Sequence, residues 1–415
     1  MAVIRPFKAL RPIPEVVTKV ASVPYDVVST EEARILAKDN PLSLLNCTRS
    51  EIHFPDSFDH YAKEIYQKAK EVLEGIKRNA PLVIEKVPSF YLYKLVMNGR
   101  AQTGIAATFS VDDYNDDIIK KHEKTRKEKE DDRTNHIVTT EAQTGPVFLT
   151  YKGVHAIDAV VKKITSEEKP LYDFRASDGI QHTVWTLPSQ YNQRFIDEMA
   201  KVKNFYIADG HHRAASASRA QKIKMEKNPQ HTGSEEYNFF IGVLFPAEQL
   251  HILPYYRVVA DLNGNSKERF LNAVAEKFSV EKSPLKEPLA AKSFCMFLDG
   301  EWFLLKVLDA VLASNSLSSS VGDHLDVSIL QNFLLHPILG IDDPRTNKRI
   351  DFVGGIRGTG ELEKLVDSGK FAVAFSLYPV TVNDLMNISD ANEVMPPKST
   401  WFEPKLRDGL FVHTI

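Results

Sequence analysis

The sequence predicts an α+β fold in which a central α/β unit is flanked by N-terminal and C-terminal α+β regions. Apolar residues recur at helical spacing across residues 56–76, as in an amphipathic helix. Residues 89–111 instead contain strand-like apolar runs around Asn98-Gly99, a dipeptide typical of hairpin turns. Further along, the apolar run 204–208 leads through a glycine into a small-residue helix, the strand-to-helix order of an α/β unit.

The N-terminal α/β region is expected to span residues 1–88. Residues 27–41 predict a helix, because Ser29 or Thr30 can accept hydrogen bonds from the N–H groups of the first turn, and acids follow there. The helix predicted over 56–76 is expected to end at Gly75, since glycine is favoured just past helix ends.

The central unit is expected to span residues 89–260, and the C-terminal α+β region, residues 261–415, is expected to pack back on the site. Apolar runs in the central unit predict strands at 145–151, 204–208, 237–246 and 251–259. In the C-terminal region the patterns predict helices at 266–278 and 327–340, a hairpin around Asp299-Gly300, and a strand at 371–380.

The composition is that of an ordinary globular protein, with 43% hydrophobic and 26% charged residues. A net charge of -3 argues against a nucleic-acid partner, because phosphate backbones are usually met by an excess of Lys and Arg. Cys47 and Cys295 lie far apart, which excludes a CxxC metal or redox motif. No apolar run approaches the ~18 residues that span a bilayer, and no apolar leader begins the sequence. We therefore expect a cytoplasmic protein without membrane contact.

The most informative stretch is Asp209-Gly210-His211-His212-Arg213, at the predicted start of a helix. The first turn of a helix has N–H groups without internal partners and partial positive charge, so it favours anions. Gly210 permits a sharp turn and close approach of a ligand, while the histidines and Arg213 add donors suited to phosphate. We predict a site for a phosphoryl or oligophosphate group; the alternative is a plain helix cap with surface histidines.

Asp209 is the exception in this stretch, because a carboxylate repels phosphate. Three roles remain open for it: helix N-cap, ligand of a phosphate-bound Mg²⁺, or hydrogen-bond acceptor for a histidine or a substrate ammonium group. Zinc is disfavoured, since adjacent histidines point to different sides of a helix and neither HxxxH nor HExxH spacing occurs.

A basic segment precedes this stretch in the chain. Its cations recur at steps of four, three, four and three residues: His122, Arg126, Lys129, Arg133 and His136. This spacing predicts one helical face of cations without an acid, which would line a polyphosphate channel beside Asp209. Glu123 lies at the edge of the stripe, where it could accept a proton from a hydroxyl. The alternative is a solvated charge run, because oppositely charged pairs four residues apart also occur.

Near the C-terminus, prolines at 396, 397 and 404 stiffen a loop that carries Lys398, Ser399 and Thr400. These three residue types are suited to binding phosphate, but the glycines of a P-loop do not precede them. Anchoring of the chain terminus by Trp401-Phe402 is the structural alternative for the same loop.

Several separate motifs, taken together, resemble one known family. They are "PYDV" (24–27), "KHEKT" (121–125), "DGHHR" (209–213), "ILPYYRVV" (252–259) and "MPPKSTWFEPKLRDGL" (395–410). In this order, and along essentially the whole chain, they resemble the family catalogued as domain of unknown function 1015 (DUF1015), some members of which look like ATP-dependent kinases of free L-serine. The middle of the chain is also similar to the ParB/sulfiredoxin-like superfamily, especially to compact archaeal free-serine kinases. This resemblance implies a ParB/sulfiredoxin-like nucleotide-binding core.

The resemblance implies a small-molecule kinase that transfers a phosphoryl group from ATP or ADP, with Mg²⁺, to the hydroxyl of free L-serine, giving O-phosphoserine. It implies catalytic roles for Glu123 as base and for Asp209 and His212. Asp209 and His211 are expected to bind substrate, and Asp209 to contact the metal. The residues expected to bind nucleotide phosphates are Gly210, His211, Arg213, His122, Arg126, Arg133, Lys398, Ser399 and Thr400.

Two other functions use the same pocket. One is a nucleotide-binding switch of the ParB-like type, in which binding or hydrolysis gates a partner contact, and the other is a phosphatase. A thiol-based reductase is disfavoured, because His211 stands where sulfiredoxins carry their reactive cysteine. The sequence leaves the oligomeric state open, with a homo-oligomer among the alternatives.

Overall fold

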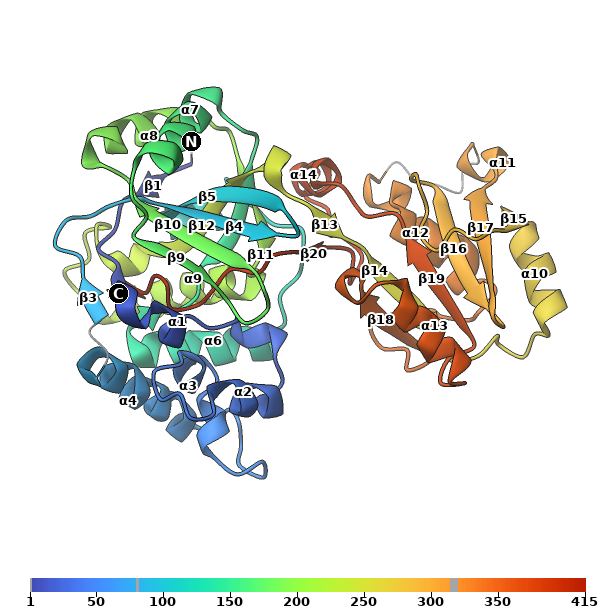
Figure 1. The fold of residues 1–415 in the computed structure, drawn as a ribbon, viewed down its shortest axis with the longest axis horizontal. Helices are drawn as coiled ribbons and strands as arrows, with labels where there is room; N and C mark the ends of the chain where they lie inside the picture. Colours follow the sequence, from blue (N-terminus) through green and yellow to red (C-terminus); the bar gives the residue numbers. More distant parts are fainter. Residues whose placement is uncertain (1, 80–81, 314–319) are drawn as a thin grey trace. The chain divides into compact units, whose positions relative to one another are not determined.

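The computed structural model describes residues 2–79, 82–313 and 320–415. These residues form two compact units (Figure 1), one made of Met1–Leu250 with Pro404–Ile415 and the other of His251–Glu403. Residues 1–88 therefore share a unit with most of the predicted core, and the last stretch of the chain returns to the same unit. Both units mix helices and strands, which confirms the predicted α+β class.

A large mixed sheet forms the centre of the first unit. Its main path runs through β6 (Ile119–Lys120), β11 (Phe205–Asp209), β8 (Val147–Tyr151), β12 (Phe239–Pro246), β5 (Arg100–Ser110), β4 (Tyr91–Met97), β10 (Gln181–Thr186) and β9 (Tyr172–Arg175), and β1 (Ile4–Arg5) pairs with β5. β8 runs parallel to β12 and β6 parallel to β11, whereas β8 and β11 are antiparallel. The hairpin predicted at Asn98-Gly99 is confirmed, because both residues have the positive φ that such turns need.

Helices cover this sheet on two sides (Figure 1). α7 (His155–Glu167) and α8 (Asn192–Met199) lie above it in the view, while α6 (Lys127–Thr140) and α4 (Lys63–Asn79) lie below. α9 (His211–Lys227) packs on α6, and small residues of α9 reach the core beside Val147 and Phe205. Small side chains on α9 thus allow its first turn to sit close to the strand ends.

The C-terminal segment ties the first unit together near the start of α9. β21 (His413–Thr414) pairs with β7 (Ala142–Gln143), and single bridges join Val412 to Leu10 and Asp408 to Ser22. Residues 404–415 therefore run beside the N-terminal segment. This path brings the two ends of the chain to the strand ends that position the site.

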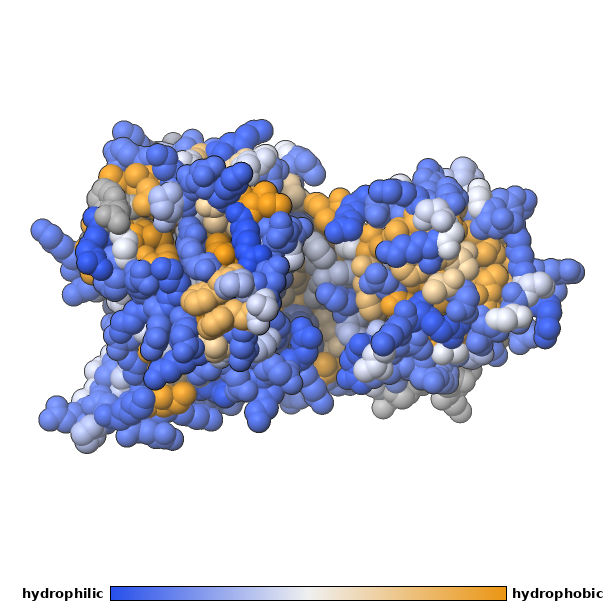
Figure 2. Space-filling model, turned by 90° about the horizontal axis from the view of Figure 1, so that it is seen from below, coloured by the Kyte–Doolittle hydropathy of each residue, from blue (hydrophilic) through white to orange (hydrophobic). Residues whose placement is uncertain are grey.

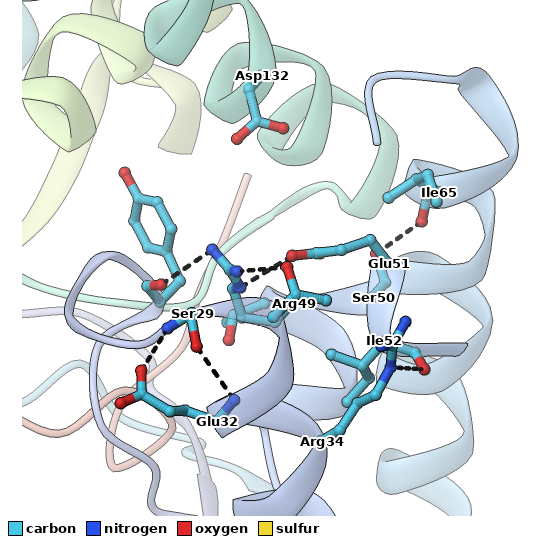
Figure 3. Close-up of polar contacts among 12 residues, drawn as sticks. Ser29, Glu32, Arg34, Arg49, Ser50, Glu51, Ile52, Ile65 and Asp132 are labelled. Carbon is cyan, nitrogen blue, oxygen red and sulfur yellow. Dashed lines mark hydrogen bonds and ion pairs between the residues drawn. The ribbon is translucent and has the colours of Figure 1, made fainter. Parts of the chain in front are cut away.

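Local contacts fix the N-terminal loop that carries the first motif. α2 (Thr30–Ala37) begins at Ser29 with a reciprocal capping box to Glu32, which confirms the predicted start. Figure 3 shows the guanidinium of Arg49 beside the carboxylate of Glu51, 2.9 Å apart. Arg49 also donates to the carbonyl of Tyr25 at 3.3 Å, so this arginine holds the loop of Tyr25 in place.

The predicted end of the long N-terminal helix is wrong. α4 runs through Gly75 to Asn79, because a glycine inside a helix costs only about 1 kcal/mol and no neighbouring atom crowds this position.

The second unit, residues 251–403, has its own antiparallel sheet. The order is β15 (Phe278–Lys282), β17 (Glu301–Val307), β16 (Ser293–Leu298), β19 (Val373–Leu377), β14 (Tyr255–Val259) and β18 (Ile350–Gly354). The hairpin predicted at Asp299-Gly300 is confirmed between β16 and β17. α13 (Thr359–Asp367) packs Leu362 and Val366 against Val258 and Phe297 of the sheet. A separate short pair joins β13 (Ile252–Leu253) to β20 (Trp401–Phe402).

Hydrophilic side chains cover most of the face seen in Figure 2, with apolar side chains in scattered patches. Exposed large apolar residues such as Ile35, Ile84 and Leu289 come from separate segments. Scattered exposures of this kind are normal on a protein surface. None of the helices in the described residues combines the length and the apolar character needed to cross a bilayer.

Candidate functional site

The strand-to-helix junction at Gly210 has the predicted form. β11 ends at Asp209, Gly210 adopts φ 89° in the left-handed region, and α9 begins at His211. This φ favours glycine over other residues. No side chain caps the N-terminus of α9 and no acid lies in its first turn. Among the described residues, therefore, Gly210 brings no capping side chain to the first-turn amides, the place where a helix favours an anion.

Asp209 lies beside this helix start in an ion pair. Its Oδ2 is 2.9 Å from Nζ of Lys405, and its Oδ1 accepts a hydrogen bond from the N–H of Gly210 at 2.9 Å. Burial would raise the pKa of Asp209, but the charges of Lys405 and Arg213 and the Lys405 hydrogen bond hold it below its usual range. Asp209 is therefore ionised, and its carboxylate is neutralised by a lysine.

His122, His211 and Glu123 form a cluster next to the helix start. The rings of His122 and His211 meet edge to face with centroids 4.4 Å apart, and both residues are buried. Nδ1 of His211 lies 3.8 Å from Oε2 of Glu123, whose side chain is 58% exposed. Glu123 thus faces solvent at the entrance of a buried imidazole pair.

Both histidines of this cluster are neutral near pH 7. Burial lowers the pKa of His122 to about 4. Burial, followed by the nearby His122, lowers the pKa of His211 well below its usual value. Among the residues that the structure describes, Nε2 of His211 has no hydrogen-bond partner. A buried polar nitrogen without a partner is costly, so His211 is suited to contact a ligand.

His212 turns toward the segment that precedes α6. Its Nε2 accepts a hydrogen bond from the backbone N–H of Arg126 at 3.1 Å. Burial, followed by the charge of Arg126, lowers the pKa of His212. This bond fixes the loop of Glu123 and Arg126 against the first turn of α9.

The prediction of one cationic face running from His122 to His136 is wrong. α6 begins at Lys127, so His122 and Arg126 lie in the loop before it. His136 is buried, with Nε2 3.2 Å from the carbonyl of Cys47. The charged segment is thus divided between a site loop and a packed helix, because the acids that follow Arg126 start a new helix there.

Arg133 points inward instead of lining a channel. It donates to the carboxylate of Asp132 at 2.8 Å and to the carbonyl of Thr48 at 3.0 Å. Its guanidinium also lies over the ring of Tyr25, 4.2 Å from the centroid. The predicted phosphate contact of Arg133 is therefore replaced by internal pairing.

Arg213 also differs from its predicted role. Its side chain is 9% exposed and its Nη2 lies 3.0 Å from Oδ1 of Asp26. Nη1 donates to the carbonyl of Pro146 at 2.8 Å, and the guanidinium lies 5.6 Å from the centroid of the Tyr25 ring. A buried guanidinium held by an acid and a carbonyl is not presented to a phosphate in this conformation.

A small cavity of about 30 Å³ lies beside these arginines. Its wall includes Tyr25, Arg133, Arg213 and Asp408. Burial raises the pKa of Asp408 to about 7, although the charge of Arg213 lowers it. Within the described part of the chain, Oδ1 of Asp408 and Nε of Arg213 are buried without hydrogen-bond partners. The cavity is large enough for ordered water or a very small polar ligand.

Sequence reasoning missed four residues that shape the site: Asp26, Tyr25, Lys405 and Asp408. All four lie in the motifs "PYDV" and "MPPKSTWFEPKLRDGL", which carried the family resemblance. Their positions in the motifs were a signal, but local patterns could not reveal that the two chain ends meet at α9.

Lys398, Ser399 and Thr400 belong to the second unit, residues 251–403. The hydroxyl of Ser399 donates to the carbonyl of Pro396 at 2.6 Å, which closes a turn. Nζ of Lys398 lies 5.1 Å from the centroid of the Tyr255 ring. The three residues are thus part of an ordered turn of that unit.

The residues present do not fit a dedicated metal site. No group of three or more His, Cys, Asp or Glu side chains in the described ranges could hold a metal ion. The predicted ligand Asp209 already pairs with Lys405. Because Mg²⁺ usually relies on carboxylates and substrate phosphates, Asp209 alone offers it little.

An uncapped helix start beside buried neutral histidines and a lysine has the chemistry of an anion-binding site. The chain belongs to the DUF1015 family, whose model matches residues 4–328 and is described as a protein of unknown function. The predicted family resemblance is thereby confirmed. No curated protein matches the chain.

The chain is similar to several solved structures at low identity. One is a free serine kinase in complex with AMP, at 13% identity and TM-score 0.33, covering 74% of this chain and 92% of that chain. Another is SbnI with C-terminal truncation from Staphylococcus aureus, at 10% identity and TM-score 0.36, covering 74% and 87%. A conserved hypothetical protein from Pyrococcus furiosus has 14% identity and TM-score 0.32, covering 74% and 94%.

Proposed function

We propose that this protein is a small-molecule kinase that transfers the terminal phosphoryl group of ATP or ADP to the hydroxyl of free L-serine, giving O-phosphoserine. The observation that carries the proposal is the position of Glu123, an exposed carboxylate 3.8 Å from the buried His211 at the uncapped start of α9. A general base and an anion-binding helix start are two of the parts that support phosphoryl transfer to a hydroxyl.

Glu123 takes the proton of the attacking serine hydroxyl in this proposal. The hydroxyl oxygen then forms the new bond to phosphorus while the bond to the leaving nucleotide oxygen breaks. The first-turn amides of α9 and the imidazole of His211 bind the phosphoryl oxygens. Such preorganised donors stabilise charge as it develops in the transition state.

In this proposal Oδ1 of Asp209, which accepts the N–H of Gly210, also receives the serine ammonium group, while Oδ2 stays paired with Lys405. His212 acts through its bond to Arg126, which holds the loop of Glu123 in position. Mg²⁺ would arrive with the nucleotide phosphates and neutralise part of their charge. Arg133 and Arg213 act as positioning residues through Tyr25 rather than as phosphate ligands.

The test is to mix the purified full chain with ATP or ADP, Mg²⁺ and each amino acid in turn, and to follow formation of the phosphorylated product. Serine-dependent transfer is expected with at least one nucleotide. Absence of serine-dependent turnover with both nucleotides would remove the proposal. Substrate-independent hydrolysis with nucleotide-dependent assembly would instead indicate the switch, and activity on phosphate esters without nucleotide would indicate a phosphatase.

Glu123→Gln is expected to reduce turnover by about 10²–10⁴-fold, because it removes the base but keeps the side-chain shape. Nucleotide binding, measured by calorimetry, should change little. Glu128→Gln is the matched control, since Glu128 is exposed in the first turn of α6. Full activity of the Glu123 variant would assign the base to another residue.

A further inference from the structure

The second unit buries an arginine inside its sheet. Arg257 lies in β14, between β19 and β18, with Phe375 and Phe352 as its register partners. It is only 4% exposed. A charged side chain at such a position is rare unless an acid pairs with it.

The contacts of Arg257 contain no acid. Nη1 donates to the carbonyl of Tyr255, and Nη2 donates to the carbonyl of Lys398 at 3.2 Å. The guanidinium also lies 5.2 Å from the centroid of the Phe352 ring. Across residues 251–313 and 320–403, no carboxylate lies within 4 Å of this guanidinium. Burial accordingly lowers the pKa of Arg257 to about 9.

A buried acid of the same unit, Asp326, differs from Arg257 because a residue of opposite charge contacts it. The buried Asp326 accepts hydrogen bonds from the N–H of Lys292 and lies 3.4 Å from its Nζ. Asp326 thus has a counter-charge and a donor, as buried ions usually do. Arg257, by contrast, donates to two neutral carbonyl oxygens, and no acid of residues 251–313 and 320–403 neutralises its charge.

A second cation joins Arg257 through the backbone. Lys398 offers its carbonyl to Arg257, adopts φ 55°, and places Nζ 5.1 Å from the centroid of the Tyr255 ring. In the part of the chain that the structure describes, Lys398 forms no ion pair. The nearby Glu403 accepts a hydrogen bond from the indole of Trp401 at 2.8 Å. Both cations therefore contact this turn, and among residues 251–313 and 320–403 neither forms an ion pair with an acid.

We propose that Arg257 and Lys398 form a binding site for a phosphate group on the second unit. Two cations match the charge of a phosphate dianion, and a guanidinium can grip its oxygens in a two-pronged way. The hydroxyl of Thr400 in the same turn offers a further donor. The phosphate comes from inorganic phosphate or from a nucleotide, and the proposal holds whether or not the chain is a serine kinase.

The experiment uses the full chain and two probes, inorganic phosphate and ADP, with adenosine as the uncharged comparison. Binding is measured by calorimetry, and hydrogen exchange is followed in the peptides that cover 251–259 and 395–403. Protection of these peptides by phosphate and by ADP indicates a phosphate site, whereas protection by ADP alone indicates a nucleotide site. Protection by adenosine equal to that by ADP, with none by phosphate, would overturn the proposal.

Arg257→Met and Lys398→Ala test the two residues. Each is expected to weaken the phosphate-dependent protection by about tenfold or more, the scale of a lost charge-assisted hydrogen bond. Lys370→Ala is the matched control, because Lys370 is exposed and also lies over an aromatic ring, 5.5 Å from the Phe371 centroid. Unchanged protection in Lys398→Ala, a surface variant that should fold, would overturn the proposal.

The stability of Arg257→Met separates a binding role from a structural one. Removing a buried cation without a counter-charge should leave hydrogen exchange in β14 unchanged or slower when no phosphate is present. Faster exchange in β14 together with unchanged phosphate binding would make Arg257 a structural residue and end the proposal.

Discussion

Both units of this protein bury arginines, and Arg213 of the first unit and Arg257 of the second are compensated differently. In the first unit, Arg213 lies 3.0 Å from Asp26 and lines a cavity with the buried Asp408. In the second unit, the contacts of Arg257 with the described residues are two carbonyl acceptors and an aromatic ring. The charge of Arg213 is therefore compensated by acids, although its Nε has no hydrogen-bond partner among the described residues, whereas the charge of Arg257 has no acid beside it within residues 251–313 and 320–403.

The comparison changes which cations we consider for ligand binding. Sequence patterns favoured Arg213 and Arg133 because they follow histidines or lie in a basic segment. Both side chains have internal partners, and their guanidiniums lie 5.6 Å and 4.2 Å from the centroid of the Tyr25 ring. Arg257, which no local pattern distinguished, has the contacts expected of a ligand-binding residue.

The largest effect is expected for Arg213→Met. The variant leaves the buried Asp408 and the partly exposed Asp26 without their buried cation. Breaking a fully buried pair costs about 3–5 kcal/mol, and solvent screening at Asp26, which is 37% exposed, places the expected cost at the lower end of that range. The free energy of local opening in α9, measured by hydrogen exchange, should fall by that amount. Arg219→Met on the same helix is the control, because its side chain is 37% exposed and its pairs with Glu130 and Asp131 contribute about 0–1 kcal/mol.

An equal loss of stability in Arg213→Met and Arg219→Met would contradict the comparison, because Arg213 would then contribute no more to stability than a partly exposed residue. A loss of nucleotide binding without loss of stability would return Arg213 to the phosphate site predicted from the sequence.

The second-largest effect is expected in Asp408→Asn, on how the stability of the protein depends on pH. Burial raises the pKa of Asp408 to about 7 in the folded chain, above the ~3.9 of an unfolded Asp. The folded state therefore binds more protons between pH 4 and 7, and the contribution of Asp408 to stability falls as pH rises through this range. The stability of the variant relative to the natural chain should rise from pH 4 to pH 7.

Subtracting the free energy of unfolding of the natural chain from that of Asp408→Asn at each pH cancels the titration of the groups that both chains share. Buried neutral histidines, such as His122 and His182, have lowered pKa values and make stability fall toward acid in both chains. Asp178→Asn is the control, because burial raises the pKa of Asp178 but its bond to Arg407 lowers it overall; its difference should stay flat from pH 4 to pH 7 and change only below about pH 4. A flat difference for Asp408→Asn would mean that Asp408 is ionised throughout.

Local patterns predicted the elements better than the site. The capped helix start at Ser29, the two hairpins and the helix start at Gly210 follow from rules that act within a few residues, and the structure has all of them. The one-face stripe failed for a local reason as well. A run of charges does not reveal where a helix begins, and α6 begins only at Lys127.

The partners of the site residues could not be predicted from the sequence. Asp209 meets Lys405, and Arg213 meets Asp26, across separations of 196 and 187 residues. No periodicity or spacing encodes contacts of this length, which arise when both chain ends pack beside the same strand ends. Glu123 was placed near the helix start by the charge stripe and by the family resemblance, and its side chain does lie beside His211 although the stripe itself does not form.

The smallest effect is expected for Asp26→Asn. This variant shows whether Asp26 or Asp408 contributes more of the counter-charge that stabilises Arg213. The side chain of Asp26 is 37% exposed, so solvent screens its ion pair and its removal should cost about 1 kcal/mol or less. The cost should shrink further in high salt, as for other partly exposed pairs. If Asp26→Asn instead destabilises α9 as much as Arg213→Met, Asp26 is the main counter-charge. Asp408 would then lie beside an arginine that Asp26 already neutralises. The difference between Arg213 and Arg257 would be due to Asp26 alone.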